Sequence, residues 1–143
     1  MTLTQEDRLE ILQDVARTWL DLLKAVRQLN DAQIQAPGTV GDWSVKDVMG
    51  HISFWEQHLI DIIEAVDAGN EPERYEEFET VNHDAVAEMA DMSLEEIREQ
   101  FMTTHDELMQ LLERTPSLSR ELVAGNTYDH YSEHSAAIRA AKR

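Results

Sequence analysis

Cysteine is absent from this chain of 143 residues. Its absence excludes a disulfide framework, a thiolate metal site and a nucleophilic cysteine. Long apolar runs are absent too, because acidic residues such as Asp61 and Glu64 interrupt each candidate well short of the ~20 residues that cross a bilayer. The first residues are polar and acidic, with no apolar signal segment after a basic stretch. We therefore expect a cytoplasmic protein with no membrane partner.

Basic residues are scarce, since 12 lysines and arginines face 29 aspartates and glutamates, for a net charge of −17. Between residues 71 and 113 there are 14 acidic residues and two bases, Arg74 and Arg98. Nucleic-acid binding requires clustered bases, and anionic membrane surfaces repel such a chain. The composition predicts no nucleic-acid partner, and we interpret the acidic excess as a solvated face.

Apolar residues make up 42% of the chain and recur at helical spacing along its whole length, with no competing period of two. The first segment places six of them on one stripe: Leu9, Leu12, Ala16, Trp19, Leu23 and Val26. A cluster of helix breakers then follows between residues 31 and 42. The pattern predicts a first long helix that ends before this cluster.

Capping signals set the remaining boundaries. Ser44 with Asp47 and Ser93 with Glu96 have the spacing of capping boxes, and they predict helices that start at residues 45 and 94. The first of these should end at Gly69, and the second should run to residue 114. A short helix is expected over residues 80–90, and Asn126 or Thr127 should cap a last helix that runs to the C-terminus. These elements predict an all-α protein, a four-helix bundle that forms one domain over residues 1–143.

Two of the six histidines, His130 and His134, stand four residues apart in the last predicted helix. Their rings therefore project from one face about one turn apart, which is a common way to offer two imidazoles to one metal ion. The same spacing also arises in pairs of surface or core-edge histidines. The pair alone leaves both interpretations open.

A third histidine favours the metal interpretation. His51 lies on the apolar face of its helix, between Val48 and Trp55, where an unpaired imidazole would cost about 1–3 kcal/mol. A buried histidine of this kind is either a satisfied core group or a ligand. His51 would meet His130 if the N-terminal halves of their helices lay at the same end of the bundle. An alternating up-and-down course provides this, whereas a crossover through residues 71–92 need not.

Two segments carry a family resemblance. Residues 43–52, WSVKDVMGHI, resemble the Trp-Ser-x-x-(Asp/Glu)-(Val/Leu)-x-x-His segment of the DinB-like superfamily, and residues 126–138, NTYDHYSEHSAAI, are similar to its closing His-x-x-x-His helix. That superfamily includes YfiT-like metalloenzymes and the N-terminal domains of mycothiol-dependent maleylpyruvate isomerases. The resemblance implies a four-helix bundle in which His51, His130 and His134 bind one divalent metal ion. Residues 71–92 match no segment of the family.

Three neutral imidazoles would leave a metal ion its double charge and an open position, which suits zinc or nickel. The chain offers no cysteine and no serine beside a base, so an incoming nucleophile is expected. Water would make the protein a hydrolase, and a low-molecular-weight thiol would make it a transferase or isomerase that detoxifies electrophiles under stress. The resemblance favours the thiol. The alternative is a non-catalytic bundle that binds or sequesters a small molecule, and either form is expected to be a homodimer.

The remaining site expectations concern the surroundings of the histidines. Four aromatic residues are placed to wall a pocket: Trp43, Trp55, Tyr128 and Tyr131. Asp47 could hold the second ring nitrogen of His51 or simply cap its helix. Of the other histidines, His58 could line the pocket or face solvent.

Two histidines stand in acidic surroundings, His83 and His105, and we expect both at the surface. No acid stands three residues before any histidine, which excludes the Glu-x-x-His motif of di-iron bundles. The HExxH motif of metalloproteases is absent as well.

Overall fold

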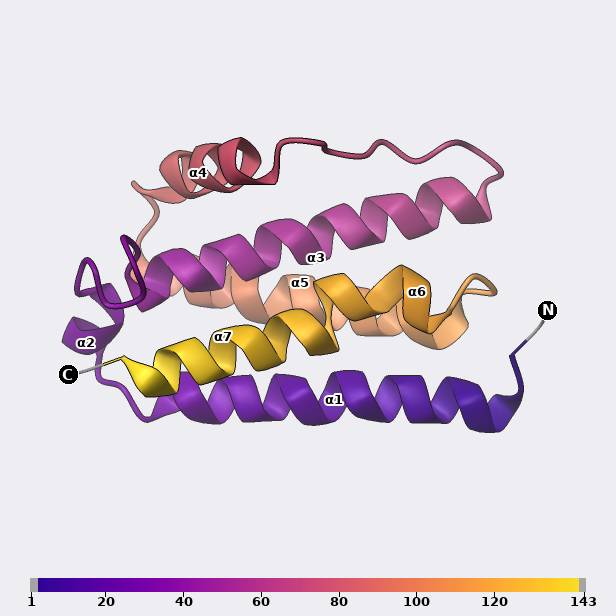
Figure 1. Cartoon of the computed structure of the whole chain (residues 1–143), viewed down its shortest axis with the longest axis horizontal. Coiled ribbons are helices and arrows are strands. Elements are labelled where there is room, and N and C mark those ends of the chain that lie inside the picture. The colour runs from indigo at the N-terminus through magenta and orange to yellow at the C-terminus, as the bar shows by residue number, and fades with distance from the viewer. Residues whose placement is uncertain (1–2, 142–143) are drawn as a thin grey trace.

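The computed structural model describes residues 3–141 and is helical apart from its connections and one isolated bridge between Val40 and Trp43. Four long helices form a bundle (Figure 1): α1 (Gln5–Arg27), α3 (Val45–Asp67), α5 (Leu94–Arg114) and α7 (Tyr128–Ala140). Shorter elements lie between them: α2 (Asp31–Gln35), α4 (Phe78–Met89), α6 (Arg120–Val123) and the 3-10 helix η1 (Ala124–Asn126). The predicted all-α four-helix bundle is confirmed.

Reciprocal side-chain caps fix where the helices begin. The Ser44 hydroxyl accepts from the Asp47 amide while the Asp47 carboxylate accepts from the Ser44 amide, both at 3.0 Å, and Ser93 forms the same box with Glu96. The predicted starts of α3 and α5 are therefore confirmed. Gly69 follows α3 with a φ of +81°, a left-handed conformation that favours glycine and ends the helix as expected.

The course of the chain is not an alternating one. In Figure 1, α1 and α7 run in one direction, whereas α3 and α5 both run in the other. Residues 68–77 return along the outside of α3, and α4 packs against α3 before α5 begins. The crossover through residues 71–92 is therefore present, and α3 and α7 are antiparallel.

The hydrophobic core lies between the four long helices. The buried face of α1 is carried by Ile11, Val15, Trp19 and Leu22, whereas Leu9 is 51% exposed. The first half of the predicted stripe was therefore wrong, because apolar residues there lie on two adjacent faces of α1 and the structure buries the other face.

None of the helices within the described part of the chain has the length and apolar character needed to span a bilayer.

Sequence patterns missed the short helices α2 and α6 and the 3-10 turn η1. Asn30 and Gln33 form a capping box for α2 inside the segment expected to be a loop. The last helix does begin after Thr127, although the Thr127 hydroxyl donates to the Val123 carbonyl instead of capping α7. The predicted continuation of α7 to the end of the chain lies partly outside the described residues.

Candidate metal centre

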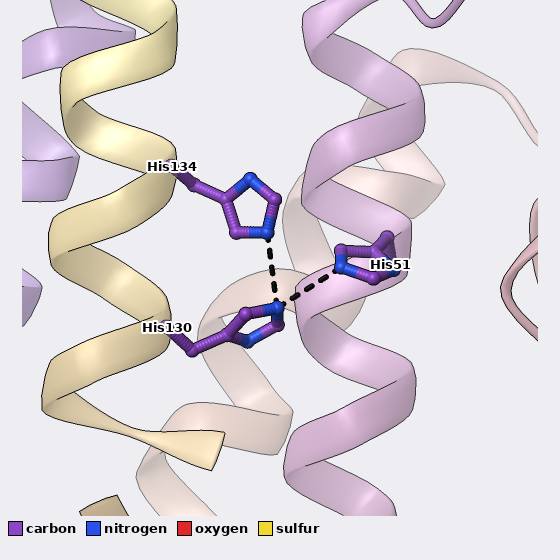
Figure 2. Close-up of side chains that lie close together, drawn as sticks. All are labelled: His51, His130 and His134. Atoms are coloured by element: carbon purple, nitrogen blue, oxygen red, sulfur yellow. Dashed lines mark hydrogen bonds between the residues drawn. The ribbon is translucent and has the colours of Figure 1, made fainter. Parts of the chain in front are cut away.

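Three histidine side chains from two antiparallel helices converge on one point (Figure 2). Nε2 of His130 lies 3.0 Å from Nε2 of His51 and 3.0 Å from Nε2 of His134. One potential ligand atom from each ring lies within 4.8 Å of the other two. Tetrahedral nitrogen ligands about 2.1 Å from a zinc ion stand about 3.4 Å apart, so these separations fit a shared ion with small adjustments.

The convergence follows from where α7 starts. After α5 the chain first forms α6 and η1, so the fourth long helix, α7, begins only near the middle of the bundle. Its first two turns, which carry His130 and His134, therefore lie beside the second turn of α3, which carries His51 (Figure 2). A crossover topology thus brings the three rings together without the parallel arrangement that an alternating course would have supplied.

All three imidazoles are held in the neutral form. Burial, with a smaller contribution from His134, lowers the pKa of His51 to about 3. Burial also lowers the pKa of His130 to about 3, with help from the two other rings. Burial lowers the pKa of His134 as well, against an opposing effect of Glu133. A neutral ring that carries its proton on Nδ1 offers its Nε2 lone pair to a metal ion, so three such rings at these separations suit one cation.

The second nitrogens of two rings have no protein partner. Nδ1 of His51 and Nδ1 of His130 are buried, and no described residue forms a hydrogen bond with either atom. The Asp47 carboxylate accepts from the Ser44 amide instead of contacting His51. Of the two roles considered for Asp47, the structure shows the cap.

The histidines open onto a cavity of about 350 Å³. Its lining combines aromatic walls with a few polar groups: Trp43, His51, Trp55, Phe78, Asn82, Gly125, Asn126, His130, Glu133 and His134. Trp55 is fixed by its indole nitrogen, which donates to the side-chain oxygen of Asn82 at 2.6 Å. The cavity is therefore lined by residues of α3, α4, η1 and α7.

Two of the four aromatic residues expected around the pocket do not line this cavity. Tyr131 follows His130 directly, so it points about 100° away around the helix and is fully buried in the core. Tyr128 packs partly buried against the core, and its hydroxyl lies 3.2 Å from the Arg120 guanidinium. Trp43 and Trp55 do line it.

The other histidines are placed in three different ways. His58 is half-buried and lines a separate cavity with Asp61 and Tyr75, and His83 is exposed as expected. His105 was expected at the surface, and that prediction is wrong. It is 5% exposed and lies 2.7 Å from the buried carboxylate of Glu56.

Sequence reasoning missed several residues around the centre. Asn82 and Phe78 of α4 could not be assigned because residues 71–92 carry only weak periodicity. Glu56 could have been found, since it lies four residues after Ile52 and seven before Ile63 on the buried face of α3. A charged side chain at such a position is a signal of a paired buried group.

A second cavity, of about 460 Å³, adjoins the first. Gly125 and Asn126 line both of them, and Arg74 and Glu121 face the second. Arg74 comes from the segment that returns along α3, so this segment and α6 extend the hollow away from the histidines. The two cavities therefore share the wall that Gly125 and Asn126 form.

The family profile of the DinB superfamily matches residues 14–139, a range that includes all three histidines. The chain belongs to the DinB superfamily. The chain also resembles a solved structure, an uncharacterised protein from Escherichia coli UTI89. The two share 14% sequence identity, the match covers 93% of this chain and 91% of that one, and the TM-score is 0.73. This likeness shows the fold alone. A comparison with functionally curated proteins found no match.

Proposed function

We propose that this DinB-superfamily protein is a cytoplasmic, metal-dependent enzyme that binds one divalent ion through His51, His130 and His134. The observation that carries the proposal is the convergence of three neutral imidazoles at the wall of a cavity. Zinc and nickel are favoured because imidazole suits both ions. An ion bound in this way would supply a Lewis acid that lowers the pKa of a coordinated water or thiol.

The cavity lining bears on the nucleophile. No described residue that lines the cavity carries a hydroxyl, thiol or amine side chain. With the imidazoles assigned to the ion and the Glu133 carboxylate to proton transfer, the nucleophile enters with the reactants, either as water in a hydrolase or as a low-molecular-weight thiol in an S-transferase or thiol-dependent isomerase. The resemblance to the DinB-like superfamily, which includes mycothiol-dependent maleylpyruvate isomerases, supports the thiol, and such a reaction would detoxify electrophiles during stress.

The polar residues of the cavity suggest separate roles. Glu133 lies in the helical turn between His130 and His134 and is the carboxylate among the described lining residues. We assign it the role of accepting the proton of the incoming nucleophile. Asn82, whose side-chain oxygen is bonded to Trp55, keeps its amide NH₂ group available to donate to a substrate.

One observation favours the second candidate, a non-catalytic bundle that binds or sequesters a small molecule. Histidines that ligate a metal usually donate the hydrogen on their second nitrogen to an acceptor, and Nδ1 of His51 and Nδ1 of His130 have no protein acceptor. This candidate predicts no turnover with any pair of thiol and electrophile. It also predicts the same thermal stability with and without a chelator.

Elemental analysis of protein purified without a histidine tag tests the proposal directly. We expect about one zinc or nickel ion per chain, and turnover of a thiol with an electrophile that a chelator abolishes. A metal-free protein whose stability is indifferent to added zinc and nickel would contradict the proposal.

A homodimer is part of the same proposal. It is supported by the exposed leucines of α1, Leu9 at 51% and Leu20 at 55%. Light scattering at micromolar concentration is expected to give twice the mass of the chain, and a monomer mass would contradict it.

A further inference from the structure

A carboxylate with no exposed surface joins three helices of the bundle next to the histidines. Glu56 on α3 is 0% exposed, and its Oε2 accepts a hydrogen bond of 2.5 Å from the Tyr131 hydroxyl on α7. The same oxygen lies 2.7 Å from Nδ1 of His105 on α5. Trp19 of α1 stacks on the His105 ring, with centroids 3.6 Å apart and planes 5° apart. We call Glu56, His105 and Tyr131 the Glu56 cluster.

The Glu56 cluster is directly connected to the candidate ligands through the chain. Tyr131 follows His130 in α7, and Glu56 lies five residues after His51 in α3. None of the three cluster residues lines the cavity, so none is placed to contact a substrate. A role in the chemistry must therefore act through the helices.

Helix packing alone leaves the two ligand-bearing helices weakly coupled. The main partner of α3 is α5, and the main partner of α7 is α1. Within residues 3–141, two hydrogen-bonded side-chain pairs connect α3 with α7: His51 with His130, and Glu56 with Tyr131. The second pair is the one that does not involve a candidate ligand.

Burial makes the geometry of the Glu56 cluster demanding. A buried carboxylate is tolerated when hydrogen-bond donors are held against it, and the folded state loses much stability if those donors move away. Burial raises the pKa of Glu56, while the hydrogen bonds from His105 and Tyr131 act in the opposite direction. Its other oxygen, Oε1, has no partner among the described residues, so both contacts depend on the position of Oε2.

We infer that the Glu56 cluster is a positioning device that fixes the separation of α3 and α7, and thereby the distances among His51, His130 and His134. Glu56, His105 and Tyr131 are positioning residues, and none of them binds the metal. The consequence for metal affinity rests on the proposed function, whereas the helix separation can be measured without any metal.

Spin labels provide the metal-free test. The chain contains no cysteine, so Gln57→Cys on α3 and Ala136→Cys on α7, both exposed, take one label each. Pulsed electron paramagnetic resonance of the metal-free protein should give a single narrow distance distribution, and adding Tyr131→Phe, which removes one hydroxyl, should broaden or shift it. The control is Ile63→Val, which makes a buried defect seven residues, or about 10 Å, beyond Glu56 along α3. Identical distributions with and without Tyr131→Phe would overturn the inference.

Cobalt binding to the unlabelled protein tests the consequence for the ligands. Tyr131→Phe should weaken Co²⁺ affinity about tenfold and change the visible absorption bands that report coordination geometry, while Ile63→Val changes neither. Glu56→Gln keeps an acceptor oxygen for Tyr131 and should retain more affinity than Glu56→Ala. If the wild type binds no cobalt while Tyr131→Phe still alters the label distance, the proposed function fails and the positioning role stands. If the wild type binds cobalt and Tyr131→Phe alters neither readout, the positioning role fails alone.

Discussion

His51 is the residue that turns a common helical pair into a candidate metal centre. Its Nε2 stands 3.0 Å from that of His130, on a different helix and 79 positions away in the sequence. Two histidines one turn apart occur widely on protein surfaces, whereas a third buried ring aimed at the same point requires the fold to place it. The function proposed here therefore depends on tertiary structure more than on the His-x-x-x-His spacing.

Removing one ligand should abolish metal binding. His134→Ala leaves two imidazoles, and we expect its metal content in elemental analysis to fall to background while the helical circular dichroism spectrum is retained. His58→Ala is the matched control, because His58 is a half-buried histidine that lines a different cavity. Unchanged metal content in His134→Ala would show that the ion, if present, is bound elsewhere.

Acid should destabilise the metal-free protein through the same histidines. His51 and His130 have pKa values of about 3 in the fold and 6.5 as the ordinary value, so below pH 6.5 the unfolded chain takes up protons that the folded chain does not. The free energy of unfolding should therefore fall as pH decreases from 6.5, by about 2 kcal/mol per histidine at pH 5.

Urea unfolding with chelator at pH 7 and at pH 5 measures this loss. His51→Gln cannot take up the proton at that position, so it should lose less stability than the wild type over the same interval. Equal losses in the two proteins would show that other groups, such as the carboxylates, control the pH dependence.

The role assigned to Glu133 is tested by its amide variant. Glu133→Gln keeps the shape of the side chain and removes its basicity, and general base catalysis typically contributes about 10²- to 10⁴-fold. We expect kcat to fall at least about 100-fold while metal content stays unchanged. A kcat within a factor of about two of the wild type would assign the proton transfer to water or to the substrate.

The candidate ligands could be identified from the sequence, whereas the residues proposed to position them could not. His51 was identified because it interrupts an apolar stripe beside a recognisable cap. His105 interrupts a stripe in the same way, four residues after Phe101 and three before Leu108, but its acidic neighbours Asp106 and Glu107 suggested a surface. Periodicity was the better guide, since neighbours in the sequence lie on other faces of a helix.

At the scale of the helix, α3 separates capping from ligand binding. Asp47 holds the first turn by its bond to the Ser44 amide and does not contact His51, one turn later. Asp47→Ala should lower the free energy of unfolding by about 1 kcal/mol, as measured in urea, because one reciprocal cap is lost. Metal affinity measured by calorimetry should stay within about twofold, since no contact with the ligands is removed.

Ser93→Ala in α5 is the control for the size of that effect, because Ser93 forms the same kind of box on a helix that carries none of the three candidate ligands. A tenfold loss of metal affinity in Asp47→Ala alone would restore the alternative role of Asp47 as a partner of His51.

Helix starts could be predicted where a capping box precedes a long apolar stripe, whereas the short helices could not, even α2 with its capping box. The starts of α3 and α5 follow from Ser44 and Ser93. The interruption by α6 and η1 before α7 has a weaker signal, because Ser119 caps α6 without a reciprocal partner and η1 has no side-chain cap. Elements of four and three residues are fixed by tertiary contacts. That interruption is what places His130 beside His51, so local patterns could not predict the arrangement of the site.

At the scale of the whole molecule, the charge of −17 opposes the compact state. Screening shortens the range of repulsion from about 30 Å in 0.01 M salt to about 8 Å in 0.15 M salt. The midpoint of thermal unfolding should therefore rise by a few degrees over that interval of sodium chloride. A variant with fewer exposed acids, Glu88→Gln/Glu95→Gln/Glu99→Gln, should show a smaller rise. An equal rise in both proteins would attribute the effect to salt exclusion instead of charge.

The crossover also divides the candidate site between the packed bundle and an outer layer that is held to it by fewer buried residues. The three histidines belong to α3 and α7 inside the bundle, whereas Phe78, Asn82 and Arg74 belong to α4 and the returning segment, where Ala85 is the buried residue of α4. Local unfolding of this outer layer would break few apolar contacts and leave the ligands in place. The rate at which reactants enter and leave can therefore be set by the opening of α4, independently of the affinity for the ion, and hydrogen exchange should detect that opening as faster exchange in α4 than in α3.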